Sequence, residues 1–267
     1  MPDDLKATVN TNVDCIDAFF SGLQGPDFLY YHMIGKTASA KAEARKIHHS
    51  PGGDFFEHAR EVLKKHKDPE SLSYIYGCMC HYILDSACHP DVVKFAKIPG
   101  SSHALVEREL DSEIIRREGG DPRYLSAALV LPVNRRLGSV IAPFYKTATP
   151  AIVNGSFYEM RGMTYLLRSA FTPVRSVVDY VVENSEKLAG HRDSIVANAP
   201  IPFLAESTET LLSELDASVK DAVEQIYEFN SSIGTDKELS HRLDPDFLGK
   251  NHSEKSDKKS KKSHKDR

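Results

Sequence analysis

The segment that most limits how this chain can fold lies between residues 71 and 89 and reads SLSYIYGCMCHYILDSACH. It is apolar most of the way round a helix, which is typical of a helix buried on every side. Asp68, Pro69 and Glu70 precede it and supply an N-cap and a proline at the first helical position, and Pro90 marks its expected end. Because such a helix must be covered, we expect the rest of the chain to pack around it.

The remainder of the sequence also has helical periodicity, and strand-like alternation over more than a few residues is hard to find. Three prolines divide residues 122 to 152 into short pieces, and no internal repeat or composition shift marks a second core. We therefore predict an all-α protein with a single multi-helix domain over residues 1 to 240. Its other helices are expected over residues 5–23, 54–65, 103–118, 156–189 (interrupted at Pro173) and 203–230.

The composition is that of a soluble globular protein, with 40% hydrophobic and 27% charged residues. No apolar run reaches the roughly 20 residues that cross a bilayer, and no secretory signal is visible. Cys78, Cys80 and Cys88 crowd together, and we interpret them as reduced thiols of a cytoplasmic protein. Metal ligation by these cysteines is the alternative, although C-x-C-H is not a familiar zinc spacing.

The charge is distributed unevenly along the chain. Residues 249 to 267 carry eight Lys/Arg against three Asp/Glu, whereas the remainder is acidic. Since this end has almost nothing apolar to bury, residues 241 to 267 are predicted to form a disordered basic tail. Such a tail can contact an anionic membrane or simply keep the protein soluble. The acidic body argues against a nucleic-acid partner.

Seven of the twelve histidines fall between residues 32 and 89. The central helix places His81, Asp85 and His89 at successive i, i+4 steps, and the next helix repeats the spacing with His103 and Glu107. One such pair is more often a surface ion pair worth about 0.2–0.5 kcal/mol. Here, however, the first pair lies in a buried helix, where an unpartnered carboxylate is costly. Because Zn²⁺ accepts imidazole nitrogen and carboxylate oxygen, the sequence predicts a metal site between the central helices.

Residues 76 to 111 resemble the zinc-ligand core of the bacterial zinc-dependent phospholipase C family, whose pattern is H-x3-D, a nearby histidine, and H-x3-E on the next helix. Two upstream stretches add to the resemblance, GLQGPDFLYYH at 22–32 and IHHSPGGDFFEHA at 47–59. A weaker likeness continues through SFYEMRGMTYLLR and the last two long helices. The resemblance implies a zinc-dependent phosphodiesterase that hydrolyses phospholipid headgroups.

Two zinc ions are implied by the resemblance, together with their ligands. Asp27 is implied as a ligand or as the catalytic base, although an aspartate after Gly-Pro is also a common turn residue. His48 and His49 are adjacent, so only one of them is expected to bind metal, and motif position favours His48. The implied metal ligands are Asp27, His48, His81 and Asp85 for the first zinc, and His89, His103 and Glu107 for the second.

Other residues of these stretches have two interpretations each. His32, His58 and Asp111 are either groups behind the ligands or ordinary polar contacts. The aromatic residues Tyr30, Tyr31, Phe55 and Phe56 either line a substrate pocket or belong to the core.

The sequence departs from the family at its first helix. Family members use a third zinc, held partly by a histidine near the start of that helix. Here no histidine precedes His32, and Asp14 and Asp17 are the obvious carboxylates of the segment. We therefore expect two zinc ions rather than three. Two rival functions stay open, namely the nuclease-type phosphodiesterases of the same superfamily and a non-catalytic, zinc-stabilised scaffold or lipid-binding homologue.

Overall fold

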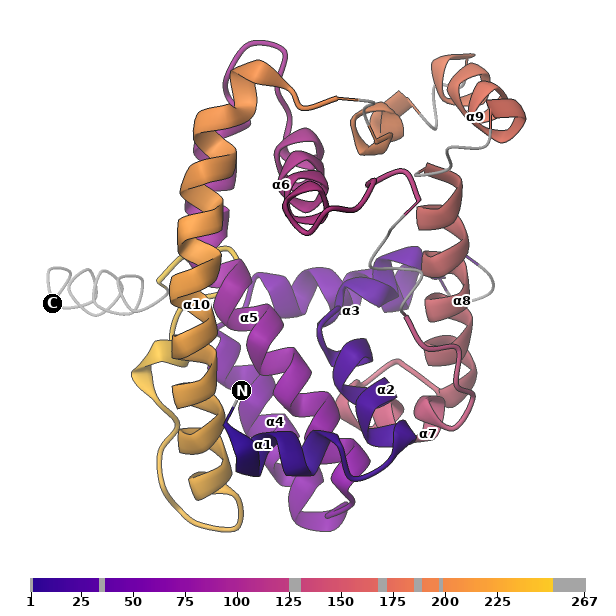
Figure 1. Cartoon of the computed structure of the whole chain (residues 1–267). Coiled ribbons are helices and arrows are strands. Elements are labelled where there is room, and N and C mark those ends of the chain that lie inside the picture. The colour runs from indigo at the N-terminus through magenta and orange to yellow at the C-terminus, as the bar shows by residue number, and fades with distance from the viewer. Residues whose placement is uncertain are drawn as a thin grey trace, which may run out of the picture.

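The computed structural model describes residues 2–33, 37–124, 131–167, 172–184, 189–196 and 199–251. Within them the chain forms helices and short 3-10 turns, with two isolated β-bridges and no named strand, which confirms the predicted all-α single domain (Figure 1). No helix in this part of the chain is long and apolar enough to cross a bilayer. The α-helices are α1 (Asp3–Val9), α2 (Val13–Gly22), α3 (Thr37–His48), α4 (Gly52–Lys65), α5 (Pro69–Phe95), α6 (His103–Arg117), α7 (Leu137–Ile141), α8 (Pro150–Leu167), α9 (Thr172–Asn184) and α10 (Ala205–Ser232).

The central helix α5 begins as predicted, because the Asp68 side chain accepts a hydrogen bond from the backbone N–H of Ser71 at 2.8 Å. It packs against α2 and along α10 (Figure 1). The predicted end at Pro90 is wrong, since the helix continues to Phe95. Proline removes one backbone hydrogen bond from a helix interior. Burial of Val92 and Phe95 in a cluster with α6 and α10 offsets that loss.

Two glycines allow α2 and α5 to approach closely. A Cβ atom at Gly22 would lie 2.1 Å from the carbonyl oxygen of Tyr74, and one at Gly77 would lie 2.2 Å from that of Phe19. Only glycine permits backbones to come this near. The contact holds the turn that follows α2 directly over the middle of α5.

Two elements near the N-terminus differ from the sequence-based expectation. The helix predicted over residues 5 to 23 is interrupted, because the Asn12 side chain accepts a hydrogen bond from Cys15 N at 2.8 Å and starts α2 anew. No helix was predicted over residues 37 to 48, where α3 forms. Its sequence, TASAKAEARKIH, is rich in strong helix formers but has few large apolar residues to produce a periodic signal.

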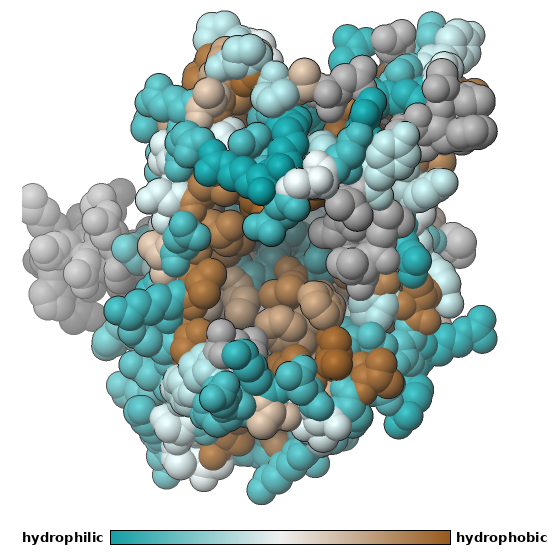
Figure 2. Space-filling view, in the orientation of Figure 1, coloured by the Kyte–Doolittle hydropathy of each residue, from teal (hydrophilic) through white to brown (hydrophobic). Residues whose placement is uncertain are grey.

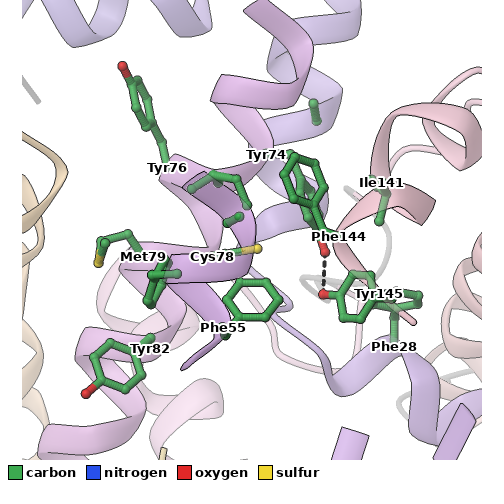
Figure 3. Packing of buried hydrophobic residues seen from close by; sticks show 14 of the residues in the cluster. Phe28, Phe55, Tyr74, Tyr76, Cys78, Met79, Tyr82, Ile141, Phe144 and Tyr145 are labelled. Carbon is green, nitrogen blue, oxygen red and sulfur yellow. Dashed lines mark hydrogen bonds between the residues drawn. The ribbon is translucent and has the colours of Figure 1, made fainter. Parts of the chain in front are cut away.

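An aromatic cluster fixes the short 3-10 turn η1 (Asp27–Tyr31) on the domain. Phe28 stacks on Phe157 with ring centroids 4.6 Å apart and meets Tyr145 edge-on at 5.3 Å. The hydroxyl groups of Tyr74 and Tyr145 are 2.6 Å apart in the same cluster (Figure 3). Phe55 and Phe56 are also buried there and belong to the core, and Phe55 in addition borders a cavity beside Lys46 and His58.

The first part of the predicted tail packs against the domain. Phe247 is 1% exposed, and its ring lies 4.9 Å from that of Tyr82. The Tyr82 hydroxyl donates to the carbonyl oxygen of Pro245 at 2.9 Å. The ordered body thus extends to Asn251. Its last part is held by the buried side chain of Phe247, an apolar residue in a segment whose overall composition is polar. The disordered tail stays a prediction for residues 252 to 267, which lie outside the described residues.

Candidate metal centre

The structure brings six of the seven predicted ligands into two groups, one from α3, α5 and η1 and the other from α5 and α6. Within each group the candidate ligand atoms all lie within 4.8 Å of one another. The first group is Asp27, His48 and His81, and the second group is His89, His103 and Glu107.

The first group is held by backbone carbonyls behind its two imidazoles. The Nδ1 atom of His48 donates to the Ala44 carbonyl at 2.8 Å, and that of His81 donates to the Leu23 carbonyl at 3.2 Å. Both rings therefore present Nε2 to the site, and His48 Nε2 lies 2.8 Å from Asp27 Oδ1. The Nε2 atom of His81 is buried and makes no hydrogen bond in the described structure. A buried nitrogen of this kind needs a partner, and zinc fits a donor set of two anchored imidazoles and a carboxylate.

The turn that follows α2 packs closely against the His81 ring. Gly25 has a φ of +50°, a conformation that favours glycine. A Cβ atom on it would lie 2.1 Å from His81 Cδ2 and 2.5 Å from His81 Nε2. Glycine is therefore required at position 25 for two reasons: the backbone has a positive φ, and the His81 imidazole leaves no space for a Cβ atom.

The second group is more open to solvent than the first. His103 Nε2 lies 2.9 Å from Glu107 Oε1, and the two side chains are 44% and 48% exposed. By contrast, the side chains of His48 and His81 are 9% and 10% exposed. The His103 ring lies 5.1 Å from that of His89, whose Nδ1 donates to the Asp85 carbonyl at 3.2 Å.

Asp85, the seventh predicted ligand, lies between the two groups rather than in one of them. Its Oδ2 atom is 3.4 Å from His81 Nε2, and its Oδ1 atom is 3.7 Å from His89 Nδ1. The i, i+4 spacing on α5 produces this arrangement, because it places one histidine a turn before the carboxylate and one a turn after it. One carboxylate can thus contribute to both groups.

The protonation equilibria of these side chains favour a shared cation. Burial lowers the pKa of both His81 and His89, so that the neutral imidazole is preferred. Burial and then the charge of Asp27 raise the pKa of Asp85 well above its ordinary value. A cation bound between the groups would instead lower the pKa of Asp85.

The pair at the centre of the first group behaves differently. Burial raises the pKa of Asp27, but the hydrogen bond from His48 and the charge of His81 outweigh it, and the net shift is downward. Burial correspondingly lowers the pKa of His48, yet its hydrogen bond to Asp27 dominates and the net shift is upward. Both shifts favour the charged forms of the pair, so zinc bound there would compete with a proton for His48 Nε2.

Comparison with known families agrees with this geometry. The family model described as zinc dependent phospholipase C matches residues 5 to 150, more than half of the chain. The chain belongs to the zinc-dependent phospholipase C family. Neither the search of curated proteins nor the search of solved structures found a significant match. The family is zinc-dependent, and every residue of the two groups lies inside the matched range.

The carboxylates near the N-terminus of this family member are engaged elsewhere. Asp14 lies 2.8 Å from the Arg136 guanidinium and accepts from the Asn134 side chain at 2.6 Å. Asp17 also accepts from Asn134, at 3.2 Å. Neither side chain joins the two groups, so the described residues offer no third cluster of this kind at the site.

Both groups border one cavity of about 600 Å³. Its α8 wall is apolar and contains Met160, Met163 and Leu167, whereas α3 contributes Lys41 and His48, and the exposed His49 directly follows that helix. Figure 2 shows this face of the molecule hollowed at its centre, beneath α6, with hydrophobic side chains along the lower border of the hollow. The cavity is therefore amphipathic, because candidate ligand side chains and apolar side chains of α8 line the same space.

Of the other residues that the sequence suggested for the site, two line the cavity and three lie outside it. Tyr30 and Tyr31 line the cavity. His32 is buried 3.8 Å from Glu159, and His58 contacts the Pro143 carbonyl at 3.3 Å, outside the metal centre. Asp111 is exposed and has other contacts. Sequence reasoning missed Lys41, because the helix that carries it was not predicted.

The difference in exposure predicts that zinc leaves the second group first. Among the described residues, no backbone carbonyl anchors His103 as Ala44 and Leu23 anchor His48 and His81, and a missing anchor lowers metal affinity by about 10–100-fold. Release to a chromophoric chelator should therefore show a fast and a slow phase of equal size. His103→Ala should remove the fast phase only. A single phase in the native protein, or loss of the slow phase in the variant, would contradict this assignment.

Proposed function

We propose that this chain is a phospholipase C-type hydrolase that cleaves the phosphodiester bond between diacylglycerol and the phosphorylated headgroup. It uses two zinc ions, one in each group, with Asp85 between them. The observation that carries the proposal is the cavity that members of both groups line together with apolar side chains of α8. A substrate that combines a phosphodiester with a hydrophobic part fits such a cavity better than a polynucleotide does.

The residues of the first group suggest how hydrolysis proceeds. Zinc bound at such a site neutralises phosphate oxygens and lowers the pKa of water toward about 7. Asp27 lines the cavity with its side chain 40% exposed, so its carboxylate can accept a hydrogen bond from the attacking water. The water oxygen would bond to phosphorus while Asp27 takes one proton from that water. The bond between phosphorus and the glycerol oxygen would break, and the proton would pass from Asp27 to the glycerol oxygen, which gives diacylglycerol and restores the carboxylate. His48 Nε2 lies 2.8 Å from Asp27 Oδ1, so the two side chains are placed to hold one zinc ion between them.

A substrate panel tests the proposal. Zinc-loaded protein should hydrolyse short-chain phospholipids, dissolved as monomers, to diacylglycerol and a phosphorylated headgroup, and a chelator should stop the reaction. Single-stranded DNA and dinucleotides, assayed in parallel, should be poor substrates. Preferred cleavage of the nucleic acid would favour the nuclease-type alternative, and two bound zinc ions without any turnover would favour a zinc-stabilised scaffold. Either result would overturn the proposal.

Three further expectations belong to this proposal. The protein would act in the cytoplasm, as its free cysteines suggest. Its basic tail would contact anionic membranes peripherally, because Lys-rich segments gain about 1 kcal/mol per charge near such surfaces. Nucleic acid is not expected as a partner.

A further inference from the structure

The two unlike walls of the cavity orient a phospholipid substrate within it, an argument that rests on the proposed function. The α8 wall, with Met160, Met163 and Leu167, suits the glycerol and acyl portion. With the phosphate at the metal groups, the headgroup is then left to the more polar part of the lining, to which α3 contributes. Side chains of α3 that face the cavity are therefore placed to select the headgroup.

Lys41 is the residue of α3 that meets this condition. It lies seven residues before His48, two helical turns away, so the two side chains share one face of the helix at a separation of roughly 10 Å along its axis. Both line the cavity. Among the described residues Lys41 has no ion-pair or hydrogen-bond partner, and its side chain is partly exposed. Its ammonium group is thus available to a ligand.

The charge of the cavity is unsuited to a cationic headgroup. Its acidic lining residues are Asp27, Asp85 and Glu107, and all three belong to the metal centre. Once zinc neutralises them, no lining carboxylate in the described structure is left for a quaternary ammonium group. Aromatic rings can also hold such a group. Of the two tyrosines that line the cavity, Tyr30 is already packed against an imidazole, since its ring lies 5.5 Å from the His48 ring and its hydroxyl 3.4 Å from His48 Nδ1. Tyr31 also has an interaction partner.

We propose that Lys41 is a specificity-determining residue that selects phospholipids whose headgroup carries a second anionic group, such as a carboxylate. The Lys41 ammonium would pair with that group while the metal centre holds the phosphodiester. The same charge would disfavour a choline headgroup by repulsion.

Hydrolysis of monomeric short-chain lipids tests this pairing without any contribution from membrane charge. Phosphatidylserine should be cleaved with a kcat/KM about tenfold higher than phosphatidylcholine of equal chain length, since a tenfold preference needs one well-placed charge pair. Lys41→Met should bring the ratio near one, and Lys41→Glu should reverse it, with zinc content unchanged. Lys46→Met is the matched control, because Lys46 is exposed on the same helix and borders a different cavity. It should keep the native ratio.

Binding of soluble phosphomonoesters provides a second measurement that needs no turnover. By calorimetry, the zinc-loaded protein should bind 3-phosphoglycerate about fivefold more tightly than glycerol 3-phosphate, which lacks the carboxylate. Lys41→Met should abolish that difference. If lipids are hydrolysed but neither ratio depends on Lys41, the inference is wrong and the proposed function stands. If the binding preference depends on Lys41 but no lipid is hydrolysed, the proposed function is wrong and the role of Lys41 as an anion-binding residue stands.

Discussion

Replacing Asp85 by asparagine is expected to lower zinc-dependent hydrolysis on the order of 10³-fold while leaving the helical content intact. Asparagine has the same shape but no negative charge. The carboxylate lies within 3.4 Å of His81 and 3.7 Å of His89, so its loss should weaken both groups. Zinc analysis should therefore find fewer than two ions per chain, and circular dichroism should match that of the native protein.

Asp91→Asn is a suitable control for this variant. Asp91 lies on the same helix, six residues further along, and pairs with Lys94 at 3.4 Å rather than with either group. Its replacement should leave zinc content and turnover near their native values. If Asp85→Asn kept two zinc ions and full activity, Asp85 would have no role in metal binding.

Gly25→Ala is expected to have the second largest effect. A left-handed backbone costs alanine about 1 kcal/mol, and the clash of its Cβ atom with the His81 ring adds about 2 kcal/mol. The midpoint of thermal unfolding should fall by roughly 6–10 °C. Because His81 must move to relieve the clash, the first group should lose its zinc, and activity with it, while the second group keeps its metal.

Gly119→Ala separates these two contributions. Gly119 has a φ of +80°, and a Cβ atom added to it would have no other atom within 4 Å, so this position carries the backbone strain without the clash. The variant should lose about 1 kcal/mol of stability and no zinc. Equal zinc loss in both variants would show that strain, rather than the position of His81, causes the effect.

The helix that forms the centre of the site could be predicted from the sequence, because its apolar composition and the i, i+4 spacing of His81, Asp85 and His89 are local signals. The assembly of the two groups could not. Asp27 reaches His81 through the turn after α2, whose close packing on α5 depends on the two facing glycines, and His48 comes from a further helix, α3. The sequence accordingly assigned Asp85 to one zinc, whereas the structure places it between both groups.

The errors have similar physical origins. The break at Asn12 depends on a capping hydrogen bond to the asparagine side chain, and asparagine is also common inside loops. Continuation of α5 past Pro90 depends on burial of Phe95 against helices distant in sequence. The cavity-facing Lys41 was missed because alanines bury the inner side of α3, and alanines give little periodic signal.

Anomalous X-ray diffraction at the zinc edge, from crystals of the zinc-loaded protein, tests the central claim most directly. Two peaks are predicted, one among Asp27, His48 and His81 and one among His89, His103 and Glu107, with the Asp85 carboxylate between them. A single peak, or peaks that none of these side chains contacts, would contradict the two-zinc centre on which the proposed function depends.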